Sequence, residues 1–197
     1  MDYIYFNSLS VDEQFVEISE RPDFLALVIP NSQRTAQLLD RAYMNYIEHN
    51  AEHIQHKRAS TFVNKLVSLI LNIDQLEAII NEITPKKKRS LVLELLLSSD
   101  YFSSYLLVEL AANVEFIKKI PDYGRWCEIL VLRRASILLQ DSPLRKFKIS
   151  ELFPLGETVE YSVFRSVLGS AYDEDRLTSD SINQLKELFP NDKYFDF

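Results

Sequence analysis

The chain contains only one cysteine, Cys127, and three glycines among its 197 residues. A single cysteine excludes a disulfide within the chain, and with it the small secreted folds that several disulfides hold together. Three isolated glycines exclude the glycine-rich phosphate loops of nucleotide-binding proteins and the Gly-x-Ser-x-Gly turn of serine hydrolases. Because no histidine lies near Cys127 in the sequence, we expect this cysteine to be a core residue and not a nucleophile.

Long apolar runs are missing as well. No uncharged stretch approaches the roughly 18 apolar residues that a membrane-spanning helix needs. The chain begins with Met-Asp-Tyr-Ile-Tyr-Phe and has no basic region there, so we expect no secretory signal peptide. These features predict a cytoplasmic protein without a membrane span. Nuclear import and delivery into a host cell stay open as alternatives.

The charge is acidic overall and unevenly distributed. The chain has 22 basic and 29 acidic side chains, a net charge of −7, which disfavours nucleic acid as a partner. Residues 1–23 carry six acids and one base, and residues 173–197 carry seven acids and three bases. Residues 118–148 carry eight bases and three acids. Acidic ends of this kind could steer a partner with a basic surface, although solvated helix faces are the simpler interpretation.

The hydrophobic pattern predicts an all-α fold. Between the seven prolines, apolar residues mostly recur at spacings of three and four, which is typical of amphipathic helices. We expect one domain, a multi-helix bundle over residues 1–197, with a looser C-terminal subdomain from about residue 150 as a variant. A short α-solenoid of helical hairpins is the alternative. The segment Glu-Leu-Phe-Pro occurs at 151–154 and again at 187–190, but this match is too short to define a repeat.

Several helix boundaries follow from capping patterns. Ser10-Val-Asp-Glu13 and Asp74-Gln-Leu-Glu77 both match the capping box and predict helices over 10–18 and 74–83. The segment 126–139 is apolar on nearly every side, so we expect a central buried helix there. The other predicted elements are a short strand at 3–6, a polar loop at 171–180, and helices at 24–29, 31–56, 61–71, 90–97, 100–117, 159–168 and 182–189.

All three histidines fall within eight residues, at His49, His53 and His56. On one long helix they would share a face, and His49-Asn-Ala-Glu52-His53 matches the His-x-x-Glu-His pattern of a class of zinc proteases. A metal-dependent enzyme centred on His49, Glu52 and His53 is therefore the alternative function. A polar extension of the helix, with no metal and no cofactor, is the simpler interpretation, because no further ligand can be identified.

Two basic features stand out. The run Lys86-Lys87-Lys88-Arg89 follows Pro85 in a predicted loop and resembles the core of a nuclear-import signal. A solvated loop and a phosphate-binding patch are the other interpretations. Arg133 and Arg134 interrupt the apolar segment 126–139, so we expect at least one of them to pair with a carboxylate. An anion site is the alternative, and it would add Lys118, Lys119, Arg145 and Lys146.

The leading hypothesis is a protein-interaction module that acts through surface complementarity, of the immunity, adaptor or injected-effector type. This hypothesis favours a binding protein over an enzyme. It also favours another protein as the partner. Acids would select the partner and buried aromatics would supply affinity. The alternative role expected for the aromatic residues of the C-terminal tail is to pack onto the domain. The candidate partner-binding residues are Asp173, Glu174, Asp175, Tyr194, Phe195 and Phe197.

Overall fold

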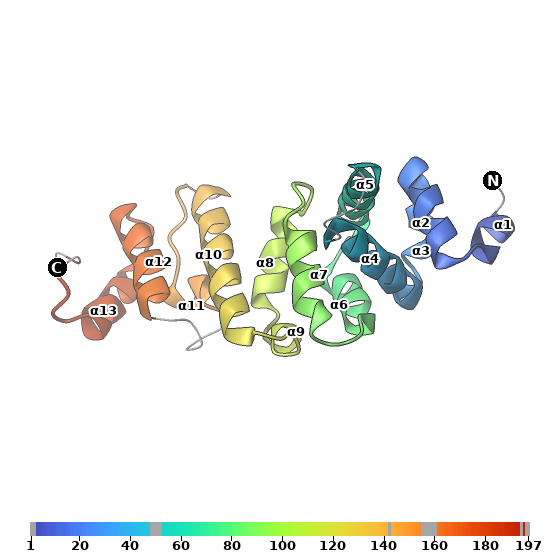
Figure 1. The fold of residues 1–197 in the computed structure, drawn as a ribbon. Coiled ribbons are helices and arrows are strands. Elements are labelled where there is room, and N and C mark those ends of the chain that lie inside the picture. The colour runs from blue at the N-terminus through green and yellow to red at the C-terminus, as the bar shows by residue number, and fades with distance from the viewer. Residues whose placement is uncertain (1–2, 48–52, 142, 155–160, 194, 196–197) are drawn as a thin grey trace. The chain divides into compact units, whose positions relative to one another are not determined.

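The computed structural model describes residues 3–47, 53–141, 143–154, 161–193 and 195. Within these ranges it has thirteen α-helices, one 3-10 helix and no strand, and 75% of the structure is helical (Figure 1). The prediction of an all-α multi-helix protein is therefore confirmed. No helix in these ranges is both long and apolar enough to cross a membrane.

The chain divides into two compact units, Met1–Leu106 and Leu107–Phe197. Helix α8 (Ser104–Ala112) contains the boundary between them. The first unit contains α1 (Tyr3–Ser8), α2 (Val11–Glu20), the 3-10 helix η1 (Pro22–Phe24), α3 (Leu25–Val28), α4 (Ser32–Ile47), α5 (His53–Leu69), α6 (Ile73–Glu82) and α7 (Lys88–Leu97). The second contains α9 (Val114–Ile117), α10 (Tyr123–Asp141), α11 (Ile149–Leu152), α12 (Tyr161–Asp173) and α13 (Ser179–Leu188). The expectation of a single domain stays a prediction.

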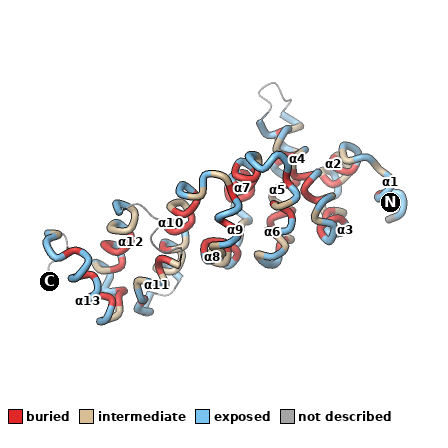
Figure 2. The backbone as a smooth tube through the Cα atoms, turned by 90° about the horizontal axis from the view of Figure 1, so that it is seen from below, coloured by how far each residue is buried: buried red, intermediate tan, exposed pale blue. Residues whose placement is uncertain are grey.

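Helix α4 is the centre of the first unit and packs against α2, α5, α6 and α7. Its stripe of Leu38, Leu39 and Ala42 is completely buried. The rings of Phe15 on α2 and Phe62 on α5 lie 5.5 Å apart beside it. Buried residues lie along the sides of these helices that face their neighbours (Figure 2). The three-and-four spacing of apolar residues therefore builds the core that the sequence predicts.

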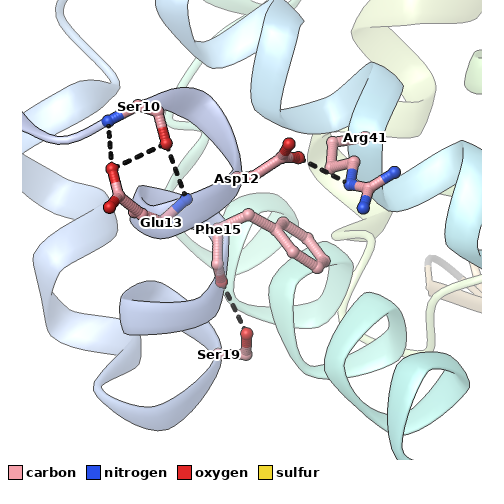
Figure 3. A network of polar contacts seen from close by, with 6 residues as sticks. All are labelled: Ser10, Asp12, Glu13, Phe15, Ser19 and Arg41. Atoms are coloured by element: carbon pink, nitrogen blue, oxygen red, sulfur yellow. Dashed lines mark hydrogen bonds and ion pairs between the residues drawn. The ribbon is translucent and has the colours of Figure 1, made fainter.

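The N-terminal capping box forms as predicted (Figure 3). The Ser10 side chain accepts a hydrogen bond from the Glu13 backbone N–H, and the Ser10 backbone N–H donates to Glu13 Oε2 at 2.8 Å. Glu13 therefore receives hydrogen bonds that lower the pKa of its carboxyl. Asp12 points the other way and accepts from Arg41 on α4 at 2.8 Å.

The predicted helix over 31–56 is wrong in its extent. Helix α4 ends at Ile47, and α5 begins at His53 and packs against it. The apolar spacing continues through both helices, so periodicity alone could not separate them. Helix α5 also begins well before residue 61, where the sequence placed its start.

Other boundaries differ because the capping residue was misassigned. Asn72, and not Asp74, caps α6 by accepting from the Gln75 backbone N–H. The predicted helix over 100–117 is two helices, because Asn113 caps a new helix, α9, after α8 ends. Residues 3–6 begin helix α1 and are not a strand.

In the second unit, α10 packs against α9, α11 and α12. Its residues Trp126, Cys127, Leu130 and Val131 are buried, but Leu132 is 43% exposed. The helix is therefore amphipathic and not buried on every side as predicted. The predicted polar loop from 171 is also too long, because α12 continues to Asp173.

Candidate functional site

The second unit contains a groove between α11, α12 and α13, and a short backbone contact fixes two of these helices. The Phe147 backbone N–H donates to the Arg176 carbonyl at 2.7 Å, and the Thr178 N–H donates to the Phe147 carbonyl at 3.0 Å. The Ile149 N–H also donates to Ser181 Oγ at 3.2 Å. The N-terminal ends of α11 and α13 therefore lie side by side.

Arg176 stabilises the same end from inside. Its side chain is buried, and its guanidinium donates to the carbonyls of Leu139 and Arg145 at 2.7 and 2.9 Å. Leu139 belongs to the last turn of α10, where helix carbonyls lack partners within the helix. Arg176 also lies over the Phe147 ring, 5.4 Å from its centroid. It therefore links α10 to the chain segment that precedes α13.

An aromatic stack lies beside the groove, and its members Phe153, Tyr161 and Phe164 also line it. The rings of Phe153 and Phe164 lie 4.4 Å apart, and those of Tyr161 and Phe189 lie 5.3 Å apart. Phe195 continues the stack 5.2 Å from Phe189. These separations are near the favourable range for aromatic pairs, so the stack is well packed.

The groove itself has a volume of about 670 Å³, which is within the size range of known ligand sites. Tyr161 and Leu188 line it and are 62% and 52% exposed. A second hollow of about 570 Å³ shares these two residues. We call the first hollow the α13 groove; it is lined by Lys148, Ile149, Ser150, Phe153, Tyr161, Phe164, Asp180, Ser181, Gln184 and Leu188.

Comparisons of the chain with protein-family models, curated proteins and solved structures found no match.

A hollow of about 450 Å³ in the first unit is more polar. Lys65 Nζ lies 2.8 Å from Asp23 Oδ1 across it, and this ammonium lowers the pKa of the Asp23 carboxyl. The Asp23 side chain is 96% exposed, so the pair is open to solvent and its attraction is weak. This hollow is a less specific candidate than the α13 groove.

The acidic residues predicted to bind a partner lie at the end of α12 and directly after it, outside the lining of the α13 groove. Asp175 Oδ1 accepts from Lys146 Nζ at 2.7 Å, and Glu174 Oε2 lies 3.7 Å from Arg176 Nη1. Asp173 is the last residue of α12. Both paired carboxylates remain more than half exposed, so their role in steering a basic partner stays a prediction.

The aromatic residues of the tail are described only in part. Phe195 is buried, with its ring 5.5 Å from that of Tyr172 in a T-shaped arrangement. It therefore belongs to the aromatic stack, which is the packing role that the sequence offered as its alternative. Tyr194 and Phe197 lie outside the described residues.

The histidines are also described only in part. His53 and His56 lie in the first turn of α5, and the His56 ring contacts Tyr46 with centroids 6.3 Å apart. His49 and Glu52 lie outside the described residues. Among the residues that can be placed, no three histidine, cysteine or acidic side chains gather around a common point. The metal site stays a prediction.

The basic run does not lie wholly in a loop as predicted, because α7 begins at Lys88. Lys88 Nζ pairs with Asp40 of α4 at 2.8 Å, and Arg89 is buried. The Arg89 guanidinium donates to the carbonyls of Ile83 and Asn81, at the C-terminal end of α6. Two of the four cations therefore hold α7 to its neighbours, whereas Lys86 and Lys87 are exposed.

Arg134 of α10, and Arg145 beyond the end of that helix, both contact Glu151 of α11. Arg134 donates to the carbonyl of Glu151, and Arg145 pairs with the carboxylate of the same residue. Partial burial lowers the pKa of the Arg134 guanidinium, and the nearby Glu151 carboxylate acts in the opposite direction. These contacts attach α11 to α10. The anion site that would combine them with Lys118 and Lys119 stays a prediction.

Sequence reasoning missed the groove, because its lining residues come from three separate helices. It also missed Arg176, which lies in an acidic tract and shows no pattern that predicts burial. The only sequence signal near the groove was the repeated Glu-Leu-Phe-Pro segment. Its two phenylalanines, Phe153 and Phe189, lie at the C-terminal ends of α11 and α13.

Proposed function

We propose that this protein is an interaction module that binds a segment of another protein in the α13 groove. The observation that carries the proposal is the exposure of Tyr161 and Leu188 in the lining of a groove of about 670 Å³. Contiguous apolar surface on a folded protein commonly marks a binding site. Aromatic and aliphatic side chains that surround a hollow can bury an apolar side chain of a partner, which is the usual source of binding energy.

The groove is also held in shape before a partner arrives. At one end, the Phe147 backbone contacts fix α11 beside α13. At the other end, Arg165 on α12 forms an ion pair with Asp192, just after α13. A surface that is already ordered loses less conformational entropy on binding, so more of the contact energy appears as affinity.

The test selects peptides from a random 16-residue library displayed against the full chain and then measures their dissociation constants. We expect Leu188→Asp to weaken binding of the selected peptides at least about tenfold, because a carboxylate in the groove lining would be desolvated on binding. Leu144→Asp is the matched control: Leu144 lies in the same unit, is 97% exposed and does not line the groove.

Circular dichroism and thermal unfolding of both variants establish that each is folded. The proposal fails if no peptide is selected, or if the selected peptides bind folded Leu188→Asp as tightly as the unchanged chain. It also fails if Leu144→Asp weakens binding as much as Leu188→Asp does.

A further inference from the structure

The segment that follows α13 contacts α12 through two side chains. Asp192 pairs with Arg165 of α12, and the Phe195 ring packs against Tyr172 of the same helix, with ring centroids 5.5 Å apart. Phe195 is buried, whereas residues 190, 191 and 193 of the segment are exposed. The segment therefore has the pattern of a bound peptide, in which a few side chains are anchors and the others remain in solvent.

The residues that receive these two anchors form one surface. Arg165 and Tyr172 are seven residues apart, so they lie on the same side of α12, about 10 Å apart along its axis. The Phe189 ring, at the C-terminal end of α13, lies 5.2 Å from the Phe195 ring and completes the site. We call Arg165, Tyr172 and Phe189 the α12 socket.

The socket matches the chemistry of both anchors. The Arg165 guanidinium donates one hydrogen bond to each oxygen of the Asp192 carboxylate, a two-point geometry that suits a carboxylate. The Phe195 and Tyr172 rings meet edge to face at 85°, which is a favourable arrangement for an aromatic pair. The chain's own segment therefore shows which ligand fits the socket: an acidic residue followed three positions later by phenylalanine.

The segment is attached to α12 by side chains. The backbone hydrogen bonds that its described residues form run along the segment itself, from the Asp192 N–H to the Phe189 carbonyl and from the Phe195 N–H to the Asp192 carbonyl, both at 3.2 Å. Segments with few buried contacts and an exposed backbone open at a lower free energy than the whole fold. The segment can therefore leave the socket while α12 and α13 stay folded.

We propose that the α12 socket binds another protein, and that the chain's own segment occupies the socket as an internal competitor. The partner carries an aspartate or glutamate three residues before a phenylalanine. It must displace Asp192 and Phe195, so its apparent affinity is reduced according to the fraction of molecules in which the socket is open. The three socket residues do not line the α13 groove, so this proposal goes beyond the proposed function and does not rest on it.

The test measures binding of a fluorescent peptide, with the sequence of residues 190–197, to the full chain by fluorescence anisotropy. We expect weak binding to the unchanged chain, because its own segment fills the socket. Phe195→Ala in the chain removes the buried ring of the competitor and should strengthen peptide binding at least about tenfold. Leu130→Ala is the matched control, because it also removes a buried side chain from the second unit but leaves the socket intact.

Further variants assign the bound peptide to the socket. In the Phe195→Ala chain, Arg165→Glu should weaken peptide binding at least about fivefold, and a peptide with Asp192→Lys should recover part of this loss. A peptide with Phe195→Ala should bind every form of the chain weakly. Circular dichroism establishes that each variant is folded. If Phe195→Ala does not fold, Asp192→Asn in the chain weakens only the ion pair and should strengthen binding about threefold.

The proposal is wrong if the peptide binds the unchanged chain and the folded variant equally, or binds neither. It is also wrong if Leu130→Ala strengthens binding as much, or if Arg165→Glu has no effect. If the unchanged chain forms dimers that Phe195→Ala abolishes, the socket exchanges segments between two copies of this chain, and the separate partner is wrong. The α13 groove is tested independently by Leu188→Asp.

Discussion

Arg165 and Asp192 form a two-pronged ion pair between α12 and the segment that follows α13. Arg165 Nη2 donates to Asp192 Oδ1 at 2.8 Å, and Nε donates to Oδ2. The Asp192 side chain is only 17% exposed, so solvent screens the pair less than it screens an ordinary surface contact. The pair holds the Leu188 end of the α13 groove in place.

Asp192→Asn should therefore destabilise the protein by about 1–3 kcal/mol, the range expected when charge-assisted hydrogen bonds are weakened. Asp175→Asn is the matched control, because the Asp175 side chain is 79% exposed and its pair with Lys146 should contribute less than about 1 kcal/mol. Urea unfolding of both variants measures the difference. Equal losses would show that the Arg165–Asp192 pair is no stronger than a surface contact.

The core of the second unit is tested at Leu130, which is completely buried on α10, as its place in the sequence predicts. Leu130→Ala should lower the free energy of unfolding by about 2–5 kcal/mol, because it leaves a cavity. Leu132 lies on the same helix and is 43% exposed, so Leu132→Ala should have a much smaller effect. A similar loss in the two variants, measured by urea unfolding, would contradict the amphipathic character of α10.

Arg89 tests whether the basic run is structural. Arg89→Met keeps most of the apolar stem but removes the hydrogen bonds to the carbonyls of Ile83 and Asn81. We expect a loss of about 2–3 kcal/mol, since those carbonyls remain partly buried without a donor. Lys86→Met also removes one positive charge, but at an exposed site, and it should leave the melting temperature nearly unchanged. If the two variants unfold alike, Arg89 is not holding α7 to α6.

The sequence predicted some, though not all, of the features whose signal lies in a few consecutive residues. The capping box of Ser10 and Glu13 needs only four positions, and the structure confirms it. The buried stripe of α10 was predictable in part, because apolar spacing reports which residues share a helix face. It could not report that Leu132 would stay exposed, since that depends on which helices pack around α10.

Features that depend on distant residues could not be predicted. Arg176 is buried because it reaches the carbonyl of Leu139, 37 positions earlier, and nothing in the tract around it indicates this contact. The α13 groove likewise depends on Phe153, Tyr161 and Leu188 lying close together. In the sequence, each of these three resembles an ordinary apolar residue of a helix.

The capping box also predicts how stability responds to acid. Hydrogen bonds from the Ser10 side chain and backbone lower the pKa of the Glu13 carboxyl in the folded protein. A carboxyl whose pKa falls on folding adds stability above its unfolded pKa, and this contribution disappears as pH falls through the folded pKa. The stabilising effect of the Glu13 charge should thus be present at neutral pH and absent well below the ordinary pKa of glutamate.

Glu13→Gln tests this, because glutamine keeps the shape of the cap but cannot ionise. The variant should melt at a lower temperature than the unchanged chain near pH 7, and the difference should close near pH 2. Glu17→Gln, on the same helix but outside the cap, should show a smaller difference near pH 7. If the melting temperature of Glu13→Gln is still lower than that of the unchanged chain by the same amount at pH 2, the substitution acts through shape and packing. The prediction that the Glu13 charge stabilises the protein would then be wrong, even though the hydrogen bonds to Ser10 are present.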